Sequence, residues 1–251
     1  MQVGFIGSGN MARALARGWG DPVLCTDSGS GRARALADEL GGEAVASNRE
    51  LAERADVVVL AHKPPQLAEV AWEAAGTAKA VVSILARTPL ADVRSVYPGV
   101  PCFRVEPNTA VEVRRGVLAF AEGDAVDTDP ALRGRLKELF ARVGTVVEVP
   151  ERLMPVAGAC SGVGPAYWAL LVEAWVDAAV RRGMPAAQAS QLVTETMAGS
   201  AELLRARDGD TLGVRRAVAS PGGTTARGLA ALERGGVRAA FQSAMDDVVG
   251  G

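Results

Sequence analysis

Two glycines near the start of the chain, Gly7 and Gly9, have the spacing of a phosphate-binding turn. They belong to a Gly-x-Gly-x-x-Ala run that ends at Ala12, with an apolar strand-like stretch before it and a helical pattern after it. A strand that turns through such glycines into a helix points free backbone N–H groups outward at the positive helix end. The missing Cβ atoms let a phosphate approach. The run therefore predicts a dinucleotide-binding turn, against the alternative of a strand-to-helix turn with no ligand.

An acidic residue, Asp27, follows Gly7 by about 20 residues, at the expected end of the second strand. A carboxylate there can accept hydrogen bonds from the adenosine ribose and would repel a 2′-phosphate, which favours NAD(H). The next residues, Ser28 to Arg32, supply two hydroxyls and an arginine that could still hold a phosphate. The cofactor is therefore predicted as NAD(H) or NADP(H), with a mild preference for NADH. A solvated turn aspartate is the alternative.

Polar residues also follow other expected strands. His62 and Lys63 come after the apolar run 57–61, at the sheet edge where ligands bind in such folds. Lys63 could contact a phosphate or a ribose. His62 is the only histidine of the chain, and a structural role is favoured over a catalytic one. Asn48 and Asn108 occupy similar positions, with turn formation as their alternative.

The segment Ser220–Thr225 has more glycines and hydroxyl side chains than a turn between two helices requires. A proline and two glycines stop one helix, and the next helix is expected to begin near Thr225. Free N–H groups at that helix start, together with two or three hydroxyls, would bind a carboxylate. A plain helix–helix turn would need only one glycine and a cap.

The second half lacks the usual proton-transfer groups. The lysines are Lys63, Lys79 and Lys137, and the one tyrosine after residue 150 is Tyr167. Dehydrogenation of an alcohol usually needs a His, Lys or Tyr to manage the hydroxyl proton. A protonated imine is already electrophilic, so a hydroxyl such as that of Thr225 would suffice to orient it or relay a proton.

These residues must be positioned by an α/β unit of the Rossmann type over residues 1–150. Strand-like and helix-like runs alternate there, which predicts a doubly wound parallel sheet covered on both faces. Strands are expected at 3–6, 22–26, 56–61, 80–84, 102–105 and 145–149, and helices at 11–17, 32–40, 66–74, 90–96 and 129–142.

Residues 151–251 show only helical periodicity, so an all-helical dimerisation and substrate domain is expected there. Helices are predicted at 167–182, 186–205, 212–219, 226–233 and 237–249. The first is apolar almost all round except for Glu173 and Asp177. About 100 residues of helix this apolar cannot easily hide their surface alone, which predicts a homodimer core.

Composition excludes several classes. Lys and Arg total 27 against 29 Asp and Glu, a net charge of −2 with no basic face for nucleic acid. The three cysteines, Cys25, Cys102 and Cys160, are far apart and lack metal-ligand spacing, which indicates reduced thiols and no metal site. No signal peptide is recognised, and no apolar run reaches the ~20 residues that cross a bilayer. We expect a soluble cytoplasmic protein without a membrane partner.

Five blocks of residues together resemble the pyrroline-5-carboxylate reductase family over essentially the whole chain. The blocks are Phe5–Ala12, Val58–Pro64, Pro107–Thr109, Gly164–Tyr167 and Ser220–Thr225. The last two are specific to the family, whereas the first is shared with many nucleotide enzymes.

The resemblance implies NAD(P)H-dependent reduction of 1-pyrroline-5-carboxylate to L-proline, in a homodimer that can assemble further. It implies that Ser220, Gly223 and Thr224 hold the substrate carboxylate and that Thr225 faces the ring nitrogen. Cofactor contacts are implied for Gly7, Ser8, Gly9, Asn10, Met11, Asp27, Asn48, Lys63, Ala86 and Asn108.

Five positions depart from the family pattern. His62, Arg87, Glu106, Ala110 and Val163 stand where Val, Gly, Met, Pro and Ser are usual. Arg87 and Glu106 would lie beside the nicotinamide and could pair or reshape that pocket. Three alternatives therefore stay open: a reductase of another cyclic imine, a hydroxyacid dehydrogenase, whose inter-domain lysine is missing here, and a catalytically silent nucleotide-binding paralogue.

Overall fold

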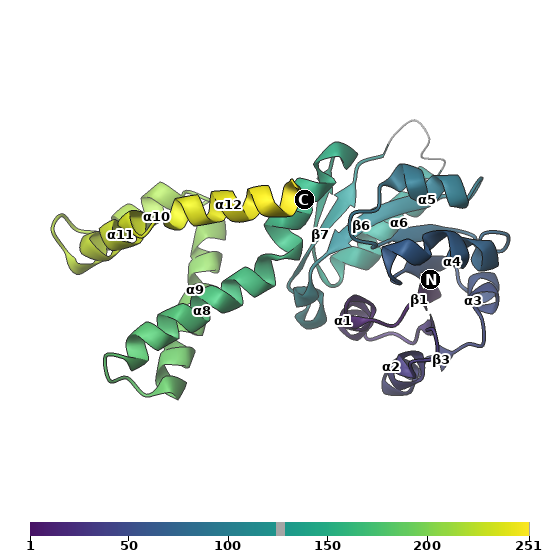
Figure 1. Cartoon of the computed structure of the whole chain (residues 1–251), viewed down its shortest axis with the longest axis horizontal. Coiled ribbons are helices and arrows are strands. Elements are labelled where there is room, and N and C mark those ends of the chain that lie inside the picture. Colours follow the sequence, from purple (N-terminus) through teal and green to yellow (C-terminus); the bar gives the residue numbers. More distant parts are fainter. Residues whose placement is uncertain (124–128, 251) are drawn as a thin grey trace. The chain divides into compact units, whose positions relative to one another are not determined.

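The computed structural model describes residues 1–123 and 129–250, and the last residue of the predicted second domain, 251, lies outside them. The chain forms two compact units, Met1–Pro165 and Ala166–Gly251. The first unit holds one eight-stranded sheet with the order β3-β2-β1-β4-β5-β6-β7-β8 (Figure 1). All neighbouring strands run parallel except β6 and β7, which are antiparallel. The Rossmann-type sheet predicted from the sequence is confirmed.

The predicted strands and helices of the first unit are all present, within a few residues of their expected ends. The strands are β1 (Val3–Ile6), β2 (Leu24–Thr26), β4 (Val57–Leu60), β5 (Val81–Ser83), β6 (Cys102–Pro107) and β8 (Gly144–Val149). The helices are α1 (Asn10–Trp19), α2 (Arg32–Leu40), α4 (Leu67–Ala74), α5 (Leu90–Val96) and α6 (Pro130–Ala141).

Within the described part of residues 1–150, three strands or α-helices were not anticipated. They are β3 (Glu43–Ala44), α3 (Asn48–Arg54) and β7 (Gly116–Ala121). The two-residue β3 is too short to show alternation, and α3 is a seven-residue helix whose start is marked by the Ser47 cap on the Glu50 N–H. The apolar run of β7 reads like the other strands, but its antiparallel pairing with β6 depends on a short 3₁₀ connection, η2 (Thr109–Val113).

Two hydrophobic layers cover the sheet. One packs α1, α2 and α6 against β1, β4, β6 and β7, and the other packs α3, α4 and α5 against the opposite face. Trp19 is central to the first layer: its ring lies 5.8 Å from Phe5 and 5.5 Å from Phe140, and its indole N–H donates to the Leu139 carbonyl. These contacts join α1 and α6 to β1 on one face of the sheet.

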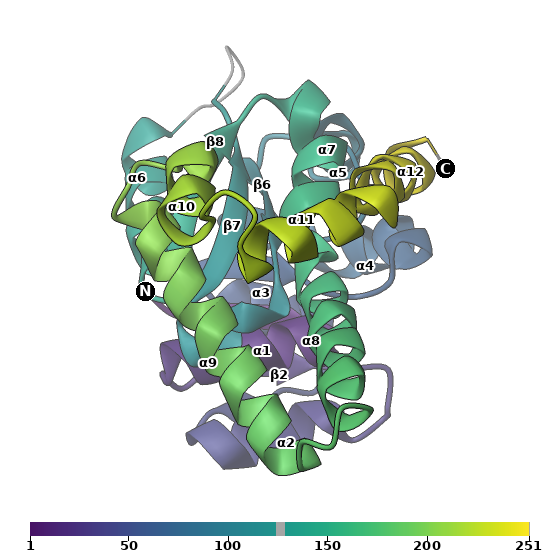
Figure 2. The same cartoon turned by 90° about the vertical axis from the view of Figure 1, so that its left-hand side faces the viewer.

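The second unit is helical, as predicted, and Figure 2 shows its helices from green to yellow. They are α8 (Gly164–Val180), α9 (Ala186–Arg205), α10 (Thr211–Val218), α11 (Thr224–Arg234) and α12 (Val237–Val249). Of residues 166–250, Ala189 and Val193 are the only buried ones. Large apolar side chains are instead left open, with Trp168 55%, Leu170 63% and Trp175 56% exposed. An apolar helical surface of this kind needs a covering partner.

The compact units divide after Pro165, whereas the sequence places the domain boundary at residue 150. The residues between these positions form η3 (Glu151–Leu153), α7 (Met154–Ala157) and the π-helix η4 (Gly158–Gly162). Met154 is fully buried with Ala119 and Ala121 of β7, which ties this segment to the sheet. One helical stretch, Glu151–Val180, is long and apolar enough to cross a membrane by length and composition alone. The expectation that the chain has no such stretch is therefore wrong by this criterion.

Candidate functional site

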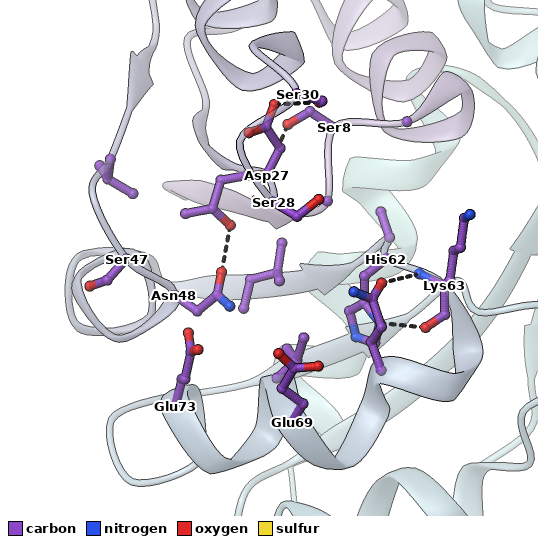
Figure 3. Close-up of a pocket in the computed structure, with 18 of the residues that line it drawn as sticks. Ser8, Asp27, Ser28, Ser30, Ser47, Asn48, His62, Lys63, Glu69 and Glu73 are labelled. Carbon is purple, nitrogen blue, oxygen red and sulfur yellow. Dashed lines mark hydrogen bonds between the residues drawn. The ribbon is translucent and has the colours of Figure 1, made fainter.

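A cleft of about 690 Å³ lies at the carboxyl ends of β1, β2 and β4 (Figure 3). This is the edge where parallel sheets of this type bind nucleotides. Of the residues predicted to contact the cofactor, six line the cleft: Gly7, Ser8, Gly9, Asp27, Asn48 and Lys63. The cleft is also lined by residues that the sequence did not single out, namely Thr26, Arg49, Gln66, Glu69, Trp72 and Glu73.

The two glycines of the turn after β1, Gly7 and Gly9, differ in backbone conformation and in the space around them. Gly7 has φ +97°, and a Cβ there would lie 2.6 Å from the backbone nitrogen of His62. Gly9 has φ −74°, open to any residue, and a Cβ there would meet no atom within 4 Å. Gly7 is therefore required by the fold itself, whereas no contact with a described residue requires glycine at position 9.

Helix α1 begins without a side-chain cap. Gly9 is its N-cap residue and supplies no side chain, and the first turn contains no acidic residue. The N–H groups of the first turn therefore face the cleft side without an internal acceptor, which is the arrangement that binds a phosphate. Asn10 and Met11 lie in this first turn, and the Asn10 side chain accepts from Arg13 at 3.1 Å.

Asp27 directs its carboxylate into its own loop. Oδ1 accepts from the Gly29 N–H at 2.8 Å, and Oδ2 accepts from the Ser30 hydroxyl at 2.8 Å and the Ala33 N–H at 2.9 Å. Partial burial raises the pKa of Asp27, but the Ala33, Ser30 and Gly29 hydrogen bonds outweigh burial and leave that pKa below its usual value. The carboxylate thus caps α2, whose own N-cap residue, Gly31, has no side chain to do so.

Asn48 and the acidic residues of α4 form the other wall. Asn48 Oδ1 accepts from the Thr26 hydroxyl at 2.6 Å, which joins the start of α3 to the end of β2. Glu69 and Glu73 extend from α4 toward the cleft (Figure 3).

His62 is held in one orientation beside this wall. Its Nδ1 lies 2.9 Å from the Lys63 carbonyl oxygen, which makes Nδ1 the protonated nitrogen. Its Nε2 is buried and has no hydrogen-bond partner among the described residues. Burial lowers the pKa of His62, so the ring is neutral at physiological pH. A neutral, fixed ring of this kind fits the structural role favoured from the sequence.

Ala86 and Asn108 do not line the cleft. Ala86 lies in the exposed turn after β5, and its carbonyl accepts from the Thr88 hydroxyl at 3.2 Å. Asn108 is buried, where its amide donates to the Ser161 carbonyl and its Oδ1 accepts from the Val117 N–H. Both follow strands of the same sheet edge, β5 and β6, so a cofactor role for either remains a prediction.

A cluster of charged residues on β6 and η3 was not predicted from the sequence. Arg104 is 4% exposed and donates to Glu151 at 2.8 Å, while its guanidinium lies 3.6 Å from Glu106. Burial raises the pKa of Glu106, Arg104 opposes that rise, and Glu151 adds to it. Glu106 packs against Gly158 of η4, where a Cβ would overlap its carboxylate. Alternation along β6 could have signalled that Arg104 and Glu106 share a face.

The serine–threonine segment of the second unit also ends in an uncapped helix start. Gly223 is the N-cap residue of α11 and provides no side-chain cap. Its N–H donates to the Ser220 carbonyl at 3.0 Å, and a Cβ at Gly223 would lie 2.5 Å from the Ser220 hydroxyl oxygen. Gly222 has φ +72°, which turns the chain into α11. The helix begins at Thr224, so Thr224 and Thr225 lie in its first turn, where the N–H groups have no side-chain cap.

Comparison with known proteins covers both units. Residues 151–250 match the family model for pyrroline-5-carboxylate reductase dimerisation, and residues 2–87 match the model described as NADP oxidoreductase coenzyme F420-dependent. A pyrroline-5-carboxylate reductase of Synechocystis is 36% identical over 98% of this chain and 94% of its own length.

Solved structures agree over the whole chain. The 1-pyrroline-5-carboxylate reductase of Streptococcus pyogenes has a TM-score of 0.88 at 28% identity and covers 99% of this chain and 96% of its own. The Plasmodium falciparum pyrroline carboxylate reductase with NADP bound has a TM-score of 0.88 at 26% identity, covering 99% and 95%. These likenesses confirm the resemblance found in the sequence: the chain belongs to the pyrroline-5-carboxylate reductase family.

Proposed function

We propose that this chain reduces 1-pyrroline-5-carboxylate to L-proline with NADPH or NADH, in proline biosynthesis. The observation that carries the proposal is the joint presence of the cleft at the β1 turn and the serine–threonine loop, in a chain related to these reductases over its full length. The residues of the cleft fit a dinucleotide, because a Cβ at Gly9 would fill open space beside uncapped N–H groups.

The substrate is a cyclic imine that carries a carboxylate. The hydroxyls of Ser220 and Thr224 and the free N–H groups at the start of α11 bind that carboxylate, since a helix N-terminus favours an anion. The Thr225 hydroxyl orients the ring nitrogen or relays its proton. The dinucleotide, when bound, supplies the hydride that adds to the imine carbon. The proton on nitrogen and the hydride on carbon together convert the C=N bond into the secondary amine of proline.

A homodimer completes the enzyme. The exposed apolar side chains of α8 lie inside the region that matches the dimerisation model, and a second copy would bury them. The same covering accounts for the apolar stretch Glu151–Val180 without a membrane. We place the enzyme in the cytoplasm, because Cys25, Cys102 and Cys160 are free thiols. We also propose that these dimers assemble further.

The test follows NADPH and NADH oxidation with 1-pyrroline-5-carboxylate. Thr225→Ala should lower kcat by about 10²-fold, the usual size of a lost proton-transfer group, while cofactor affinity is unchanged. Thr225→Ser keeps a hydroxyl and should restore most of the rate. Thr211→Ala, at the exposed first residue of α10, is the control because it removes a threonine hydroxyl from another helix start.

The alternatives have separate outcomes. Normal cofactor binding without turnover would identify a silent paralogue. Turnover of a hydroxyacid, or of a cyclic imine without the carboxylate, would move the assignment to another substrate. A Thr225→Ala variant as fast as the wild type would remove Thr225 from the reaction.

A further inference from the structure

A turn of π-helix, η4, connects the segment beside the sheet to the first helix of the second unit. In this turn the Val163 N–H donates to the Gly158 carbonyl at 3.3 Å, a hydrogen bond that spans five residues instead of four. Such turns are rare, and they occur frequently at functional sites. The chain continues from η4 directly into α8, which begins at Gly164. Contacts that fix η4 therefore also fix the start of α8.

Two residues at the end of β6 and just after it contact this turn. The Asn108 amide donates to the Ser161 carbonyl at 3.2 Å. The Glu106 carboxyl packs against the two glycines of η4. A Cβ at Gly158 would overlap Glu106 Oε1, and a Cβ at Gly162 would lie 3.9 Å from the same oxygen. The missing side chain at Gly158 thus leaves the space that the Glu106 carboxyl occupies.

The Glu106 carboxyl has a weak partner. Among residues 1–123 and 129–250 its ion-pair partner is Arg104, and the separation of 3.6 Å is too long for a good hydrogen bond. The Arg104 guanidinium donates instead to Glu151 Oε1 at 2.8 Å. The same Glu151 oxygen accepts from the Leu90 N–H at the start of α5, at 2.9 Å. Glu106 therefore lies beside these hydrogen bonds without taking part in them.

The cluster formed by Arg104, Glu106 and Glu151 has an excess negative charge when both carboxyls are ionised. One buried guanidinium then faces two carboxylates, and η4 contributes no charged side chain. Glu151 Oε2 is also buried, and no described residue donates to it. A proton on Glu106 removes the excess charge. Burial, with a smaller contribution from Glu151, raises the pKa of Glu106 against the opposing effect of Arg104.

We propose that Glu106 is a positioning residue for the reaction: its neutral carboxyl packs η4 against β6, and its ionisation loosens that turn and slows turnover. The neutral acid lies on the glycines of η4 without repulsion from Glu151. The carboxylate is repelled by Glu151 and needs water in a partly buried place. Because η4 continues into α8, a loosened turn leaves the start of the second unit less firmly fixed. The effect on turnover rests on the proposed function, whereas the effect on the turn does not.

Hydrogen–deuterium exchange tests the turn without substrate. The exchange rates of the amides of residues 158–163, each corrected for its intrinsic rate at that pH, give their protection. In the wild type this protection should fall at least about threefold as the pH rises above the usual glutamate value of 4.5, the size of a weak coupling within a charge network. Amides of α1 are the internal reference. In Glu106→Gln the protection should stay constant, because the amide does not ionise.

A second variant keeps the test independent of how well Glu106→Gln folds. Glu151→Gln removes the like charge and retains an oxygen that can accept from Arg104 and Leu90. Ionisation of Glu106 should then disturb η4 less, so the pH dependence of protection should weaken. In the double variant the pH dependence should be no smaller than in Glu106→Gln alone, because the repulsion is already absent there.

Steady-state kinetics tests the reaction over the same pH series. The kcat at saturating NADPH and 1-pyrroline-5-carboxylate is compared for the wild type, Glu106→Gln and the control Glu138→Gln, an exposed glutamate of α6. The ratio of the Glu106→Gln kcat to the wild-type kcat should rise at least about threefold with pH, with the KM for NADPH unchanged. Glu138→Gln should follow the wild type.

The proposal is overturned if wild-type protection at residues 158–163 does not change with pH relative to α1, or if Glu106→Gln keeps the wild-type pH dependence. A constant kcat ratio would also overturn it, since a role in stability alone would change the melting temperature and not that ratio. The proposed function fails separately. A protein that does not reduce 1-pyrroline-5-carboxylate would lose that function, while exchange still decides whether Glu106 controls η4.

Discussion

Alanine at Gly9 and alanine at Gly7 should have opposite effects, although the two residues lie in one turn. At Gly7, φ is +97°, so an L-residue costs about 1–2 kcal/mol in backbone strain. Its Cβ would also lie 2.6 Å from the His62 nitrogen and 2.7 Å from the Ala61 carbonyl, and overpacking of this kind costs about 1–3 kcal/mol. The two contributions together predict that Gly7→Ala lowers the free energy of unfolding by about 2–5 kcal/mol.

Gly9 offers the opposite case. Its φ of −74° suits alanine, and the new Cβ meets nothing within 4 Å. Reduced freedom of the unfolded chain should leave Gly9→Ala unchanged in stability or raise it by up to about 1 kcal/mol. The methyl group would stand where a phosphate must approach the N-terminus of α1. A hundredfold loss of NADPH affinity, about 2.7 kcal/mol, is expected.

Urea unfolding followed by circular dichroism gives the first quantity, and NADPH fluorescence titration gives the second. Wild type, Gly9→Ala and Gly7→Ala are compared at the same ionic strength, because phosphate binding weakens with salt. The reasoning is refuted if Gly9→Ala binds NADPH like the wild type, or if its stability falls as far as that of Gly7→Ala. Either result would mean that open space at Gly9 is not reserved for a ligand.

Two other predictions concern charge and assembly. Because burial raises the pKa of Glu106 from its usual 4.5, the folded protein holds that proton more tightly than the unfolded chain, and stability from this residue should fall as pH rises above about 4.5. In Glu106→Gln, the melting temperature should fall less as the pH is raised above about 4.5, and an unchanged pH dependence would contradict the shift. On α8, Trp175 is 56% exposed, so Trp175→Glu should place a charge in the dimer surface and yield monomers by light scattering. A variant that remains dimeric would place Trp175 outside that surface.

The sequence predicts most elements of this fold because the local signals agree with the tertiary structure. Helix α2 ends at Leu40 beside Gly41, which has the left-handed φ of 65° that a helix stop favours. Strand β4 is buried on both faces, so its apolar run is uninterrupted. Strand β3 was missed because two residues are too few to show alternation, and it forms by pairing with Leu24 and Cys25 of β2.

The candidate site divides in the same way. Glycine spacing at the first turn and the Ser220–Thr225 run are visible in the sequence, since backbone geometry demands particular residue types there. Glu69 and Arg49 lie in helices whose turns look like any solvated helix surface. Their place on the cleft wall follows from the order of β2, β1 and β4 in the sheet. No local pattern reports that order.

By itself the sequence determined the Rossmann-type unit, the helical unit and the family, because apolar periodicity and glycine spacing act over a few residues. Only the tertiary structure decided what Asp27 does. An aspartate after a second strand reads as a ribose acceptor, yet here the loop to α2 folds back and supplies three donors to its carboxylate. These hydrogen bonds join residues that a turn brings together, so the residue type alone could not show that three acceptor sites of the carboxylate serve its own loop and the start of α2.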